Sequence, residues 1–195
     1  MATIKLAFFK ADTIYGSMKS RLISKWTKSP YSHVELIIEK DTVFNHKPEI
    51  KPLLATTYKK VCSYEKLYDP NLKEEDFNFL QFTSSPDYGG VCLTYHKINN
   101  IEYDYLEFEV NNIEWIIDFF YSIRYSKYDN VGILGFLLPF KDRTNEWFCS
   151  ESCSNALKII GFKPMWLIEP SSVSPGMLFN MVSAYIEGCE NVIKN

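Results

Sequence analysis

The stretch Ser32-His-Val-Glu-Leu-Ile-Ile-Glu39 consists largely of β-branched and aliphatic residues, a composition typical of a buried strand. A histidine inside such a strand is costly to bury unless polar partners satisfy it. Glu35 follows His33 by two positions, so the two side chains project from the same face of the strand. The stretch therefore predicts a strand that carries a polar pair into an otherwise apolar core.

The residues before this strand predict a further strand and a helix. Residues 4–9 have the apolar content of a buried strand. Ser17 is placed to cap a short helix that ends before Ser29-Pro30. The apolar face of this helix holds Met18, Leu22 and Trp26.

The residues after it predict more strands and helices, without a repeat or a linker. Lys40-Asp41 is expected to turn the chain into a second strand near residues 42–46, which would complete a hairpin. Irregular structure is expected for an insertion at about residues 41–80. Further strands are expected at residues 77–82, 91–98 and 105–110, with a tight loop at 84–90. Helices are expected at residues 113–123, 148–160 and after Pro175, and Asn111 or Asn112 is placed to cap the first of them. We therefore expect one α+β domain over residues 1–195, with an antiparallel sheet packed against helices.

Composition excludes several classes of protein. The 21 Lys+Arg and 24 Asp+Glu leave a formal net charge of -3 and form no basic block, so nothing indicates nucleic-acid or anionic-membrane binding. The longest apolar run, residues 131–140, is too short to span a bilayer and contains Gly and Pro. We expect a protein with no transmembrane segment.

The cysteines and the first residues bear on location. The five cysteines are odd in number and irregularly spaced, which favours a reduced, intracellular setting over a disulfide scaffold. Residues 1–10 carry lysines and lack the apolar core of a signal peptide, so a cytoplasmic location is expected. Frequent Asn, Lys, Ile and Tyr residues are typical of an AT-rich genome such as that of a phage.

Cys149 stands where a helix is expected to begin. Unpaired backbone N–H groups and the helix dipole at such a position favour a thiolate and lower the pKa of the thiol. The same N–H groups, that of Ser150 included, can stabilise an oxyanion formed beside the sulfur. Tyr128-Asp129 precede this helix and are placed to wall a site there, with the Tyr128 hydroxyl able to bind a carbonyl. Cys149 is therefore a candidate nucleophile, and Tyr128 and Ser150 are candidate substrate-binding residues.

His33 is the candidate base for that nucleophile. Three residues are candidates for orienting its imidazole: Glu35 on the same strand, Asn45 on the next predicted strand, and Asp87 in the predicted loop. Glu35 is favoured because it shares a strand face with His33.

Cys149 and Cys153 share a helix face, which raises the alternative of a metal site completed by His33 or His46. No Cys-x-x-Cys pair or second ligand cluster supports it, so no metal is expected. Cys153 falls on the inward face of the helix, and we expect it to pack in the core.

Taken together, Tyr31-Ser-His-Val-Glu-Leu36, Tyr128-Asp129 with Gly132-Ile133-Leu134, and Trp147-Phe-Cys-Ser-Glu151 resemble the circularly permuted branch of the NlpC/P60 superfamily, in particular its phage and bacterial YiiX-like members. Residues 84–91 and 170–178 are similar to the corresponding loop and C-terminal segments. The resemblance touches most of the chain, with residues 41–80 the poorest match.

The resemblance implies a papain-like fold in which the histidine strand precedes the cysteine helix. It implies Cys149 as nucleophile and His33 as base, a third polar residue that varies, and no cofactor. Superfamily members cleave amide bonds in cell-wall peptides or act on lipid and other acyl groups. We therefore expect a cysteine peptidase or amidase that forms an acyl-enzyme. The alternatives are a lipid or protein acyl hydrolase or acyltransferase, with residues 131–140 receiving an acyl chain, and a non-catalytic binding module that keeps the fold.

Overall fold

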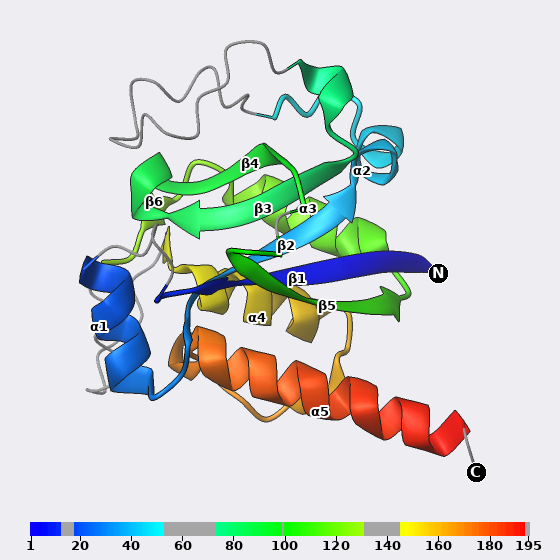
Figure 1. Cartoon of the computed structure of the whole chain (residues 1–195). Coiled ribbons are helices and arrows are strands. Elements are labelled where there is room, and N and C mark those ends of the chain that lie inside the picture. Colours follow the sequence, from blue (N-terminus) through cyan, green and yellow to red (C-terminus); the bar gives the residue numbers. More distant parts are fainter. Residues whose placement is uncertain (13–17, 53–72, 99, 131–144, 194–195) are drawn as a thin grey trace.

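The computed structural model of the chain describes residues 1–12, 18–52, 73–98, 100–130 and 145–193. Within these residues the architecture is mixed α+β, with a curled sheet of seven strands and five α-helices (Figure 1). The strands are β1 (Ala2–Lys10), β2 (Tyr31–Glu39), β3 (Phe79–Ser85), β4 (Gly90–His96), β5 (Tyr103–Val110), β6 (Lys127–Tyr128) and β7 (Glu146–Trp147). The helices are α1 (Met18–Thr27), α2 (Lys40–His46), α3 (Ile113–Ile123), α4 (Cys149–Ile159) and α5 (Pro175–Ile193).

The sheet is curled so that strands far apart in its order approach each other. The strand order is β5-β1-β2-β3-β4-β6-β7, and all pairs are antiparallel except β6 and β7. His96 on β4 nevertheless contacts Tyr103 and Tyr105 on β5, with ring centroids 5.8 and 6.0 Å apart. One face of the central strands is therefore enclosed by the curl itself.

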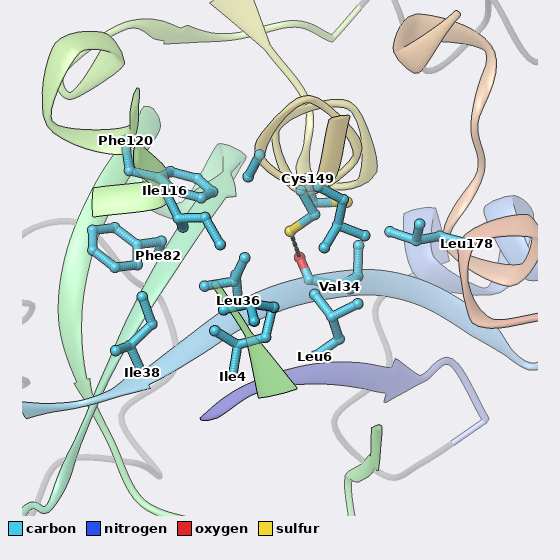
Figure 2. Close-up of a cluster of buried hydrophobic side chains, with 14 of the residues drawn as sticks. Ile4, Leu6, Val34, Leu36, Ile38, Phe82, Ile116, Phe120, Cys149 and Leu178 are labelled. Atoms are coloured by element: carbon cyan, nitrogen blue, oxygen red, sulfur yellow. Dashed lines mark hydrogen bonds between the residues drawn. The ribbon is translucent and has the colours of Figure 1, made fainter. Parts of the chain in front are cut away.

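The other face of the sheet carries the apolar core. α4 packs against β2 and β3, and it also contacts α3 and α5 (Figure 1). Alternate positions of β1 and β2 point towards these helices, as the two-residue period of a strand requires. These side chains are at most 1% exposed, and Figure 2 shows most of them with residues of α3, α4 and α5: Ile4, Leu6, Phe8, Val34, Leu36 and Ile38.

The enclosed face is polar along the centre of the sheet. The register places Ala7 of β1 opposite Glu35 on one side and Tyr105 on the other, and it pairs Ile37 of β2 with Gln81 of β3. In such a register the odd-numbered residues of β1, β2, β3 and β5 share one face. His33 and Glu35 therefore lie on this enclosed face.

Most predicted elements are present, with small shifts at their ends. The strand of the polar pair, the first strand, the hairpin of β3 and β4, β5 and the three C-terminal helices all occur near their expected positions. The predicted loop at residues 84–90 is shortened because β3 extends to Ser85, and a 3-10 turn, Pro86–Tyr88, follows.

The predicted hairpin after β2 is wrong, because residues 40–46 form helix α2. Lys40-Asp41 lacks the glycine or asparagine that a tight hairpin turn favours. Asp41 in the first turn and His46 in the last turn suit the helix dipole, and only Val43 of this segment is buried. The neighbour of β2 is instead β3, which comes from much later in the chain.

Some expectations concern segments outside the described residues. They are the cap at Ser17, residues 53–72 of the expected insertion, and the apolar run at residues 131–140. Among the helices that the structure describes, none combines the length and apolar character needed to cross a membrane.

Candidate active site

Cys149 is the first residue of α4, at the end of that helix which meets β2. Phe148 occupies the N-cap position in an extended conformation, and its N–H donates to the Glu151 carboxylate at 3.4 Å. The segment before it is fixed by two hydrogen bonds to the Trp147 carbonyl, from the Ser84 hydroxyl at 2.6 Å and from the Asp129 N–H at 3.1 Å. The helix start is thus anchored to β3 and to the residue after β6.

His33 faces this helix start from β2. Its side chain is 19% exposed, and its Nε2 lies 3.2 Å from Glu35 Oε1 and 3.1 Å from Thr83 Oγ1. Cys149 lies near enough to the ring to raise the pKa of His33. Because Nε2 is occupied by Glu35 and Thr83, Nδ1 is the ring nitrogen left for the sulfur. A carboxylate only accepts, so Nε2 carries a proton and Nδ1 is free to take one from the thiol.

The two groups change each other's acidity in opposite directions. Burial alone would lower the pKa of His33, but the charge of Cys149 and the hydrogen bonds to Cys149 and Glu35 raise it well above its usual value. Burial alone would raise the pKa of Cys149, but the charge and hydrogen bond of His33, followed by the backbone N–H groups of Val34 and Ser150, lower it. The arrangement favours a thiolate–imidazolium pair.

Glu35 supports the charged form of His33. The carboxyl is 3% exposed, and burial alone would raise its pKa. The hydrogen bond and charge of His33, with smaller contributions from His96 and Thr83, lower it instead. Glu35 is therefore ionised when His33 is protonated, and the two charges stabilise each other inside the curl.

Of the three candidates for orienting His33, Glu35 is the residue that hydrogen-bonds it. Asn45 is exposed on α2, which follows the opposite end of β2 from His33. Asp87 lies in the 3-10 turn after β3, and its charge acts on Tyr128.

Tyr128 lies close to the candidate nucleophile. Burial, and next the negative charge of Cys149, raise its pKa well above the usual value, so the phenol stays protonated and is a hydrogen-bond donor. Its backbone N–H donates to the Gly89 carbonyl at 3.2 Å. The close approach of this segment to β4 requires Gly90, where a Cβ atom would meet the Ser126 carbonyl oxygen at 1.8 Å.

Ser150 contributes through its backbone rather than its side chain. The side chain is fully buried, and its hydroxyl has no hydrogen-bond partner among the described residues. Its backbone N–H instead helps to lower the pKa of the Cys149 thiol.

Cys153, one turn further along α4, is a core residue as expected. It is 1% exposed within the apolar cluster, and its Sγ lies 3.9 Å from the Val34 carbonyl oxygen. Burial, followed by the charges of Cys149 and Glu35, raises its pKa well above the usual value. Its thiol is therefore protonated and unreactive.

A chain of hydrogen bonds behind Glu35 was missed by the sequence reasoning. Gln81 Nε2 donates to Glu35 Oε1 at 3.3 Å, Gln81 Oε1 contacts His96 Nδ1, and His96 Nε2 lies 3.1 Å from the Tyr105 hydroxyl. Since an amide oxygen only accepts, Nδ1 of His96 carries a proton. Burial lowers the pKa of His96, so the ring is neutral and Nε2 accepts from Tyr105.

This chain has a single direction from Tyr105 to Glu35. It also explains why Gln81 and His96 are each only 6% exposed although both are polar. The alternation in Phe-Leu-Gln-Phe-Thr83 was a usable signal, because it places Gln81 and Thr83 on the same face of a strand. The contact of β4 with β5 had no local signal, since it depends on the curl.

The metal alternative gains no support. No group of three or more His, Cys, Asp or Glu side chains suited to a metal ion occurs in the described part of the chain. His46 instead pairs with Asp118 of α3 at 3.1 Å.

Comparisons with known proteins identify no relative, since no protein-family model matches the chain and no curated protein matches its sequence.

Proposed function

We propose that the protein is a cysteine hydrolase that cleaves an amide bond, in a peptide or cell-wall peptide, through an acyl-enzyme. The observation that carries the proposal is that Cys149, at the start of α4, has its pKa lowered by a His33 ring whose Nε2 lies 3.2 Å from Glu35 Oε1. Nucleophile, base and orienting group are the three parts of a catalytic triad.

The reaction would use these groups in order. The thiolate of Cys149 attacks the substrate carbonyl and forms a C–S bond, and the oxyanion is stabilised by backbone N–H groups of the first turn of α4 and by the Tyr128 hydroxyl. His33 Nδ1 gives its proton to the amine as the C–N bond breaks. Water, deprotonated by the same nitrogen, then hydrolyses the thioester and restores the thiolate.

The order of the elements supports a permuted papain-like fold of the NlpC/P60 type. The strand that carries His33, β2, precedes the helix that carries Cys149, α4. The helix packs directly against that strand, which belongs to an antiparallel part of the sheet. This is the arrangement that the resemblance of the three motifs implies, and we include it in the proposal.

The experiment is to trap the acyl-enzyme. The wild-type protein is incubated with a peptide library, peptidoglycan fragments and, separately, acyl esters of lipids, and intact masses are recorded after acid quenching. The proposal expects an adduct of acyl mass at Cys149 with the amide substrates, present in Cys153→Ala and absent in Cys149→Ala. Adducts from lipid esters alone would favour the acyl-hydrolase alternative, and turnover by Cys149→Ala would overturn both.

A further inference from the structure

Helix α1 turns its apolar side outwards. Met18, Leu22 and Trp26 are spaced four residues apart, so they form one stripe along the helix, and they are 81%, 41% and 41% exposed. No residue of α1 is buried. The side turned to the protein is only partly buried and mostly consists of small polar residues: Ser20, Ile23, Ser24 and Thr27. An ordinary surface helix turns its apolar side to the core and its polar side to solvent, and α1 has the opposite arrangement.

Local contacts close the end of the helix, and Ser29 holds the turn after it against α5. The Ser24 hydroxyl donates to the Ser29 carbonyl at 2.5 Å, and the Thr27 hydroxyl donates to the Ile23 carbonyl at 2.9 Å. Ser29 also packs so closely on the start of α5 that a Cβ atom at Gly176 would meet its hydroxyl oxygen at 2.2 Å. The end of α1 is therefore held against the start of α5 at Ser29.

Cations lie on both sides of the stripe. Because each residue turns the helix by about 100°, Arg21 and Lys25 lie along one edge of it and Lys19 lies along the other. Lys28 follows the helix, and residues 18–30 contain no acidic residue. All four cations are exposed, and no salt bridge to any of them occurs within the described residues.

We propose that this side of α1 is a docking surface for an anionic lipid bilayer. An apolar stripe with a tryptophan, flanked by lysine and arginine, matches the interface between acyl chains and anionic headgroups. The long cationic side chains can extend to the headgroups while the stripe is buried. Nucleic acid would leave Met18, Leu22 and Trp26 in water, so the stripe argues for lipid.

The local charge differs from the charge of the whole chain. A formal net charge of -3 gave no indication of membrane binding, but that sum averages over the molecule. The charge that a bilayer meets is that of the surface facing it, within about 10 Å at ordinary ionic strength. α1 leads directly into β2, so a docked α1 would hold the site of His33 beside the bilayer. The docking itself does not depend on the chemistry of Cys149.

Vesicle flotation tests the proposal on the full chain. The protein is mixed with vesicles of phosphatidylcholine alone, or of phosphatidylcholine and phosphatidylglycerol in equal parts. Binding is expected for the anionic vesicles and to weaken with added salt. The double variants Leu22→Ser/Trp26→Ser and Arg21→Gln/Lys25→Gln should each lower the partition coefficient on the order of tenfold or more.

Matched controls change the same residue types elsewhere on the surface. Trp166 and Leu167 are 58% and 100% exposed, so Trp166→Ser/Leu167→Ser controls for general loss of apolar surface. Lys97→Gln/Lys163→Gln controls for charge. With brominated lipid, fluorescence quenching should be lost in Trp26→Phe and kept in Trp166→Phe. No binding to anionic vesicles, or binding unaffected by Leu22→Ser/Trp26→Ser, overturns the proposal.

Discussion

The first and second turns of α4 each present a buried cysteine towards β2, but the two thiols differ in acidity. Cys149 is 4% exposed and Cys153 is 1% exposed, so burial alone does not distinguish them. The pKa of Cys149 is lowered by His33 and by backbone N–H groups, whereas burial raises the pKa of Cys153 without a cation to oppose it. The partner that a thiol faces therefore decides its reactivity, and burial makes that partner more effective.

Replacing Cys149 should have the largest effect on activity. Cys149→Ala is expected to abolish turnover of any verified substrate, because a nucleophile forms the bond on which the reaction depends. The thermal unfolding midpoint should remain near that of the wild type. The measurement is turnover alongside circular dichroism, with Cys153→Ala as the matched change one turn away. A folded and active Cys149→Ala protein would contradict the mechanism.

The next largest effect is expected at Glu35. Glu35→Gln keeps the shape but removes the charge that stabilises the His33 imidazolium, so activity should fall on the order of 10²-fold. The pKa of His33 should fall and that of Cys149 should rise. Exposed Glu109 on β5 supplies the control Glu109→Gln. Equal rates for the wild type and Glu35→Gln would remove Glu35 from the triad.

A smaller effect is expected from the hydrogen-bond chain behind Glu35. Gln81→Met keeps the volume and removes one donor to the carboxylate, so the pKa of Glu35 should rise. The acid limb of the activity profile should move to higher pH, with a loss of about a few-fold at neutral pH. Thr94→Val is the control, because Thr94 faces Gln81 and its hydroxyl has no partner in the described structure. An unchanged acid limb in Gln81→Met would show that the chain is only structural.

The smallest effect is expected at Cys153. Cys153→Ala should cost about 1 kcal/mol of unfolding free energy, since it removes a buried sulfur. The reactivity of Cys149 should not change. Urea unfolding measures the first expectation and alkylation of Cys149 the second. A Cys153→Ala protein with altered Cys149 alkylation would show that the two turns are coupled.

The parts of the site that sequence could predict are those with local signals. His33 and Glu35 lie two residues apart on one strand, so their shared face followed from strand geometry alone. Cys149 was recognisable because a polar loop and a helix start surround it. In both cases the physical cause lies within a few residues.

The parts that sequence missed depend on contacts between distant segments. Thr83 reaches His33 only because β3 pairs with β2, and His96 reaches Tyr105 only because the sheet curls. The failed strand at residues 42–46 has the same origin, since the true neighbour of β2 was not the next segment in the chain. The outward stripe of α1 was predicted as a face, but its exposure depends on the rest of the fold.

The pH dependence of Cys149 alkylation tests the central claim most directly. Iodoacetamide rates are measured by peptide mass spectrometry in the wild type and in His33→Ala, with exposed Cys189 as an internal reference. Only the thiolate reacts, so the wild-type rate should rise with pH and level off well below the free-cysteine pKa of about 8.5. In His33→Ala burial is no longer opposed by a cation, and the midpoint should move to higher pH. Coincident curves for the two proteins would contradict the Cys149–His33 pair.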